Sequence, residues 1–180
     1  MKELKVKNII IGKQFESCKN YKEFMEIVKE RNIKVHVAEI GEKIKIEENI
    51  YFDILWPNPK NVITENSINN NSLVCKLKYK SFSMLFTGDI EKIAEKEILE
   101  EYKNDTENLN SKLLKVAHHG SKTSSINEFI EAVKPKVALI GVGKNNKFGH
   151  PNDEVIKRLE NFRNKNLQNR QNWRNINISR

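Results

Sequence analysis

Three short polar segments could carry chemistry, and each follows an apolar, strand-like run. They are residues 87–89 (TGD), 118–121 (HHGS) and 149–151 (GHP), which together hold three of the four histidines. In layered α/β proteins, side chains just beyond neighbouring strands meet at one edge of the sheet, where ligands bind. Histidine and aspartate are protein ligands of zinc, iron and manganese. A carboxylate that bridges two metals can hold a water acidic enough to supply hydroxide near neutral pH.

Each segment also has a purely structural interpretation. Asp89 could cap the helix expected after it. His118 and His119 could form a hydrogen-bonded pair in a loop, and residues 149–151 could be only a turn. The presence of all three segments after successive strands favours a functional site. His36 lies within a strand-like run outside the three segments, so we interpret it as structural.

The elements around these segments predict a layered α/β fold. Apolar runs and alternation predict strands at 6–12, 34–39, 43–46, 50–56, 72–79, 82–87, 113–117 and 137–141. Helical spacing predicts helices at 20–31, 91–102, 125–133 and 153–160. A tight turn at 80–81 makes a hairpin of its two flanking strands, and the Asn-rich residues 58–71 are expected to form a loop.

The charge and composition limit the other functional classes. The net charge is +8, but residues 162–180 hold five Lys/Arg and no Asp/Glu, so residues 1–161 carry only +3. We find no P-loop, RNP-like strand or zinc finger, which weakens a nucleic-acid-binding interpretation. The sequence contains no membrane-length apolar run, no signal peptide and no CxxC pair. These features predict a cytoplasmic chain.

The three segments in their wider context resemble a known family. Residues 83–89 (SMLFTGD), 113–121 (LLKVAHHGS) and 142–151 (VGKNNKFGHP) resemble the later motifs of ComEC-like metallo-β-lactamase-fold hydrolases. They stand in that family's order with similar spacing, and the resemblance covers about residues 6–161. It implies an αββα sandwich with a metal pair at one edge, two zinc ions or else manganese or iron.

The resemblance also implies roles for individual residues. Asp89 would bridge the metals and His150 would be a late metal ligand. His118 and His119 would lie beside the metals, where one of them contacts the scissile group or protonates the leaving group. The substrate, a phosphodiester or nucleic acid, would be bound by Gly120, Ser121 and Lys144. The alternative for Lys144, and the commoner case for such a residue, is a plain surface lysine.

The sequence departs from the family in lacking its HxHxDH motif, because His36 is the only histidine before His118. We therefore expect residues 1–161 to be the C-terminal part of such a domain, without the N-terminal part of the sandwich. Apolar surface would then be uncovered. Such a fragment would not complete a two-metal site, could be without any bound metal, and would be inactive alone.

The basic residues 162–180 form the second departure, and we expect them to be frameshifted or disordered. The family continues here with a strand like LGIKIYRTD. Written in A/T-rich codons, residues 162–176 yield LGIKIYRTDKIGEI after deletion of one T at Phe162. The codons are chosen rather than observed, so the coding DNA would decide this hypothesis.

Three functions therefore compete. The first is a metal-dependent hydrolase. The second is a non-catalytic degenerate domain, or a half-domain that needs a partner carrying the missing N-terminal half. The third is a basic nucleic-acid-binding module, whose DNA binding would survive His150→Ala and be lost with residues 162–180.

Overall fold

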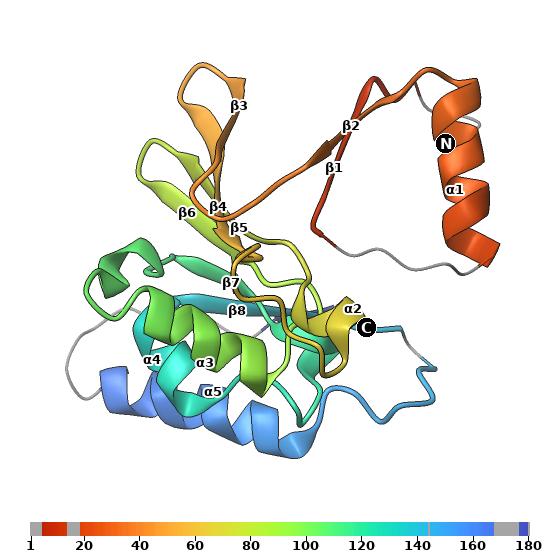
Figure 1. The fold of residues 1–180 in the computed structure, drawn as a ribbon. Coiled ribbons are helices and arrows are strands. Elements are labelled where there is room, and N and C mark those ends of the chain that lie inside the picture. The colour runs from red at the N-terminus through yellow and green to blue at the C-terminus, as the bar shows by residue number, and fades with distance from the viewer. Residues whose placement is uncertain (1–4, 14–18, 144, 168–176, 180) are drawn as a thin grey trace.

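The computed structural model describes residues 5–13, 19–143, 145–167 and 177–179. The chain begins with a β–α–β unit of β1 (Asn8–Ile11), α1 (Lys19–Glu30) and β2 (Lys34–Val37). The two strands pair in parallel and form a sheet of their own. Figure 1 shows this unit to one side of the remaining structure.

The remaining strands form one mixed sheet of seven strands in sequence order. They are β3 (Lys43–Glu47), β4 (Ile50–Trp56), β5 (Val74–Tyr79), β6 (Phe82–Phe86), β7 (Leu113–Lys115), β8 (Val137–Gly141) and β9 (Asn177–Ser179). Strands β3 to β6 pair antiparallel, whereas β6 to β9 pair in parallel. The hairpin turns at Asn49 and Lys80 have positive φ, as tight hairpin turns require.

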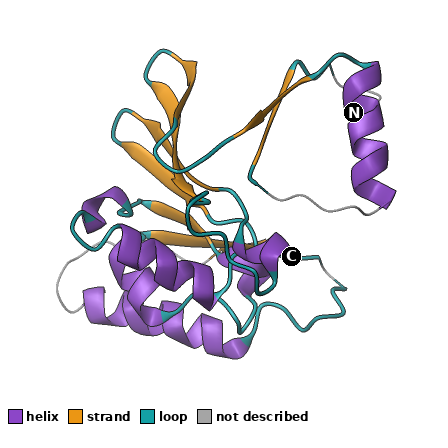
Figure 2. Ribbon diagram, in the orientation of Figure 1, coloured by secondary structure: helices purple, strands orange, loops and turns teal. Residues whose placement is uncertain are grey.

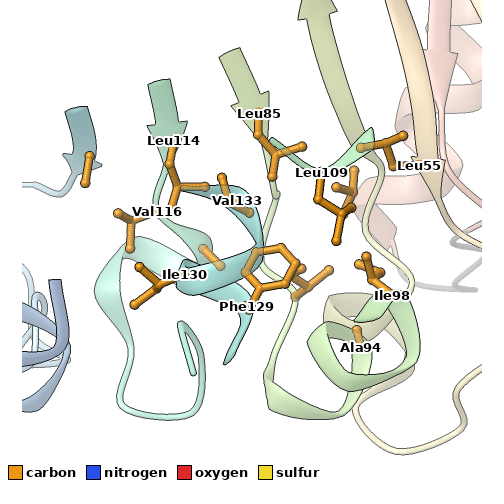
Figure 3. Packing of buried hydrophobic residues seen from close by; sticks show 14 of the residues in the cluster. Leu55, Leu85, Ala94, Ile98, Leu109, Leu114, Val116, Phe129, Ile130 and Val133 are labelled. Carbon is orange, nitrogen blue, oxygen red and sulfur yellow. The ribbon is translucent and has the colours of Figure 1, made fainter. Parts of the chain in front are cut away.

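Helices α3 (Lys92–Glu101), α4 (Asn127–Val133) and α5 (Asp153–Leu167) lie on one face of this sheet (Figures 1 and 2). Between sheet and helices lies the hydrophobic core (Figure 3). Leu85, Leu114 and Ala138 are in register on adjacent strands and are buried. Phe129 of α4 packs in the same cluster and is only 1% exposed.

The opposite face of the sheet is less well covered. Its side chains alternate in sequence with the core residues and include Met84, Phe86, Leu113 and Leu139. All four are partly buried. The helices α3 to α5 therefore bury one face of the sheet and leave the other with apolar side chains in partial contact with solvent.

The sequence predicted strands β1 to β8 and the main helices, with different ends in places, whereas β9 lies in the tail that was expected to be frameshifted or disordered. The expected loop at 58–71 contains a short helix, α2 (Ser67–Asn70), and two 3-10 turns, η1 (Thr106–Asn108) and η2 (Ala117–Gly120), were not predicted. Helix α5 continues to Leu167, across the expected domain boundary at 161, because Phe162 is buried against the core. Lys144 and residues 168–176 lie outside the described residues, so the frameshift stays a hypothesis.

Strand β5 turns a lysine toward the helices and apolar side chains toward the less covered face. The apolar residues Cys75 and Leu77 lie on the less covered face, while Lys76 faces the helices and is 3% exposed. The ammonium of Lys76 donates hydrogen bonds to the carbonyls of Asn108 and Asn110, which satisfies its charge inside the fold. No helix in the described ranges is long and apolar enough to span a membrane.

Candidate functional site

The three polar segments of the sequence meet at one edge of the main sheet. They follow β6, β7 and β8, which run in parallel, so their carboxyl ends lie side by side. The hydroxyl of Thr87 donates to the carbonyl oxygen of Lys115 at 2.6 Å, and the amide of His118 donates to the carbonyl oxygen of Gly88 at 3.1 Å. These bonds fix the first segment against the second.

Contacts join the four predicted side chains of the site in two pairs. His119 Nε2 lies 3.7 Å from Asp89 Oδ1, and His119 Nδ1 is 2.7 Å from the carbonyl oxygen of Gly141. The ring centroids of His118 and His150 are 5.8 Å apart, with an edge-on geometry. The structure thus brings Asp89 and the three histidines together, while their chemical roles stay predictions.

The histidine pair has a strained backbone. His118 (φ 46°, ψ 43°) and His119 (φ 55°, ψ 21°) both adopt the left-handed conformation. For residues other than glycine this conformation costs on the order of 1–2 kcal/mol each. Such strain persists only where the surrounding structure enforces it, and it is enriched at functional sites. The strained pair therefore supports a functional interpretation of the HHGS segment over a purely structural one.

Gly120 connects the second segment to the third. Its φ is +80°, and a Cβ there would lie 2.8 Å from Pro151 Cβ, so only glycine fits. Its carbonyl oxygen accepts from the amide of Asn152 at 2.9 Å. Ser121 is buried, and its hydroxyl is 3.0 Å from the Thr123 hydroxyl. The observed contacts of Gly120 and Ser121 shape the turn, and substrate contact by either residue stays a prediction.

Sequence reasoning missed Glu91, a carboxylate directly behind His118. Glu91 Oε1 lies 3.5 Å from His118 Nδ1, and Glu91 accepts hydrogen bonds from Thr123 at 2.8 Å and Asn66 at 3.0 Å. His118 Nδ1 is buried and has no hydrogen-bond partner. A carboxylate at this distance can orient the ring by accepting its Nδ1 proton after a small shift. In the sequence, the one feature that could have pointed to Glu91 is its position two residues after Asp89.

The surroundings of Glu91 keep it ionised. Burial alone would raise the pKa of Glu91, but the hydrogen bonds from Thr123 and Asn66, with His118 nearby, outweigh burial and lower its pKa. The pKa of His150 is lowered, first by burial and then by His118 and His119. The site therefore favours an ionised carboxylate beside His118 and a neutral imidazole at His150, and neutral imidazole is the form that binds metals.

Lys115 supplies a positive charge near these groups. Its ammonium donates to the carbonyl oxygen of Val116 at 2.9 Å. Burial lowers the pKa of Lys115, and the nearby charge of Asp89 opposes this effect. Lys144, the predicted substrate-binding lysine, is not among the described residues. Among the described residues, Lys115 therefore places a positive charge near Asp89.

The donor atoms do not by themselves fit a metal ion. A stable protein site for zinc takes at least three protein ligands. Among the residues that the structure describes, no three His, Cys, Asp or Glu side chains are grouped closely enough to hold one. His36 is apart from the site and pairs with Glu42. The predicted divalent metal, and above all a metal pair, would need donors beyond these residues.

Comparison with known proteins identifies relatives concerned with competence. No family model matches the chain. ComE operon protein 3 of Bacillus subtilis is 33% identical over 160 residues, which is 89% of this chain and 20% of that protein. Competence protein ComA of Neisseria gonorrhoeae is 31% identical, and Recombination protein 2 of Haemophilus influenzae is 33% identical. These two matches cover 62% and 64% of this chain, and 15% and 14% of the relatives.

One solved structure is a distant neighbour. It is a putative metal-dependent hydrolase from Parabacteroides distasonis, with a TM-score of 0.44 and 14% sequence identity. The match covers 73% of this chain and 57% of the neighbour. The chain spans about a fifth or less of the curated relatives described above. It is a mixed α/β homologue of a segment of ComE operon protein 3 and of competence protein ComA.

Proposed function

We propose that this chain forms one side of the active site of a metal-dependent phosphodiester hydrolase of the ComEC-like, metallo-β-lactamase type. The observation that carries the proposal is the convergence of Asp89, His118, His119 and His150 at the carboxyl ends of parallel strands. The strained histidine pair adds to it, because backbone strain of this kind is enriched at functional sites.

In this proposal Asp89 and His150 are metal ligands, and the remaining ligands come from outside the described residues. They would belong to another segment or to another chain. His118 contacts both the partly buried carboxylate of Glu91 and the ring of His150. This position suits a group that contacts the scissile phosphate or protonates the leaving oxygen, with Glu91 holding the ring in one orientation.

Nucleic acid is the substrate class that the relatives support. Their names refer to competence and recombination, and both processes involve DNA. A second candidate, a non-catalytic half-domain that needs a partner, is favoured by the lack of a three-ligand group among the described residues.

Calorimetric titration of the full chain with Mn²⁺ or Zn²⁺ tests the metal site. We expect His150→Gln and Asp89→Asn each to weaken metal affinity by at least about tenfold, as the loss of a ligand or its support does. His36→Gln is the matched control, because His36 contacts Glu42 away from the site. Equal affinities in all four proteins would contradict the proposed ligands.

Hydrolysis separates the two candidates. The metal-loaded chain is incubated with a single-stranded oligonucleotide and with a small aryl phosphodiester. Cleavage that is lost in His118→Ala supports the hydrolase, whereas metal binding without cleavage supports the partner-dependent half-domain. The absence of both metal binding and cleavage would overturn the proposal.

A further inference from the structure

Phe148 exposes an aromatic ring beside the candidate site. Its side chain is 82% exposed, more than any other large hydrophobic side chain among the described residues. The next in order, Ile46, is 53% exposed. A large apolar ring left in water forgoes the stabilisation that burial would give it. An isolated exposed apolar residue is ordinary in itself, so the argument depends on what holds this ring and what lies beside it.

The backbone around Phe148 is fixed by hydrogen bonds. Asn146 uses its side-chain amide at both ends: Oδ1 accepts from the amide of His150 at 2.9 Å, and Nδ2 donates to the carbonyl oxygen of His150 at 2.8 Å. The amide of Asn146 donates to the carbonyl oxygen of Gly143 at 3.1 Å. Gly149 turns the chain with a φ of +69°. The ring is therefore presented by a closed, cross-linked turn.

Phe148 also continues a row of rings that leads into the site. Its ring lies nearly parallel to that of His150, at 18°, with centroids 5.9 Å apart. The His150 ring in turn meets His118 edge-on at 5.8 Å. The neighbouring Lys147 is exposed and can contact a phosphate. A flat, held ring next to a cation is the arrangement by which proteins bind single-stranded nucleic acid.

We propose that Phe148 is a stacking platform for an unpaired base of a single-stranded nucleic acid, next to the phosphodiester that contacts His118. This inference rests on the proposed function and narrows its substrate class. The base stacks on the open part of the Phe148 ring, and Lys147 contacts the backbone. Stacking requires an unpaired base, so a duplex cannot use the platform without opening. Every base has a flat face, so the platform selects single strands and not sequence.

Fluorescence anisotropy with a labelled oligothymidine tests this platform in the full chain, in EDTA so that no metal held by His150 contributes. Phe148→Ala should weaken binding by about 5- to 100-fold, and Phe148→Tyr should restore it. Phe82→Ala is the matched control, because Phe82 is a 37% exposed phenylalanine at the opposite end of β6. An abasic oligonucleotide of equal length should bind wild type and Phe148→Ala alike.

A second measurement reports stacking directly. In Phe148→Trp, a base that stacks on the ring should quench the added indole fluorescence, and an abasic strand should leave it unchanged. Three outcomes overturn the inference: equal oligonucleotide affinity in wild type and Phe148→Ala, no oligonucleotide binding by wild type, or an effect of Phe148→Ala on self-association alone. Suppose that Phe148→Ala weakens oligonucleotide binding while His150→Gln leaves metal affinity unchanged. The proposed hydrolase is then refuted, and the stacking platform is retained.

Discussion

The β1–α1–β2 unit and the main sheet contain similar apolar patterns but bury them very differently. Within the described part of residues 5–38, the buried apolar side chains are Val28, Ile33 and Ala38. None of them belongs to the core cluster, which begins at Leu55 and ends at Phe162. Ile10 and Met25 remain more than a third exposed. An amphipathic pattern thus predicts an element and one apolar face, but not a partner for that face.

The β1–α1–β2 unit meets the main body at the chain that follows β2 and at Gly12. The amide of Ala38 bonds to the Ile11 carbonyl within the unit, whereas the amide of Ile40 bonds to the carbonyl oxygen of Pro57 in the main body. Gly12 is packed against the backbone of residues 71–73, where a Cβ would lie 3.1 Å from the carbonyl oxygen of Asn71. The comparison therefore predicts that the main body determines stability and that the unit contributes little to it.

The largest expected effect is on the core. Phe129→Ala should lower the free energy of unfolding by about 3–5 kcal/mol, because it leaves a cavity beneath the sheet. Phe24→Ala in α1 is the matched control and should cost less than about 1 kcal/mol, since Phe24 is only partly buried. Denaturant unfolding followed by tryptophan fluorescence, to which buried Trp56 contributes, measures both. Equal losses would show that the two regions unfold as one cooperative unit.

An intermediate effect depends on pH and on Glu95 in α3. Glu95 is fully buried and accepts the amides of Ser125 at 2.6 Å and Ile126 at 2.9 Å, which holds the loop after the HHGS segment. Burial raises the pKa of Glu95 to about 7, against the hydrogen bonds and Arg158, which lower it. The folded state therefore binds more protons than the unfolded state between about pH 4.5 and pH 7.

The contribution of Glu95 to the free energy of unfolding is fully present below pH 4.5. It is lost as the pH rises through about 7. The slope is at most about 1.4 kcal/mol per pH unit. The difference between wild type and Glu95→Gln in unfolding free energy, measured across this range, isolates the contribution. If the two proteins give parallel curves, the carboxyl group does not change its protonation on folding.

The smallest effect concerns His36 and Glu42, where the unit joins the main body. The hydrogen bond from His36, at 2.5 Å, is the main reason that the pKa of Glu42 is lowered. Its contribution is present above about pH 4.5 and is lost as the pH falls through the lowered pKa, the opposite sign to Glu95. Because both side chains are exposed, His36→Gln should change stability by less than about 0.5 kcal/mol. A larger loss in thermal or denaturant unfolding would mean that this pair fixes the unit to the body.

The sequence by itself determined the elements and the positions of the site segments. Period-2 alternation, apolar runs and helical spacing located strands β1 to β8 and the main helices, because these patterns are local in the chain. The rule that parallel strands end at one edge predicted that Asp89, His118 and His150 would approach one another. The site could be located this way because its residues follow strand ends directly.

Only the tertiary structure decided how these residues are held. The approach of Glu91 to His118 and the clamp of Gly120 against Pro151 join residues about 30 positions apart, and no local pattern encodes such distances. The burial of Lys76 contradicts its polarity and is possible only because two carbonyl groups from residues 108 and 110 meet its ammonium. The left-handed histidines likewise depend on neighbours that force them, since their intrinsic preference is the opposite. Burial and strain are properties of the partners that folding brings together, and the sequence alone does not name those partners.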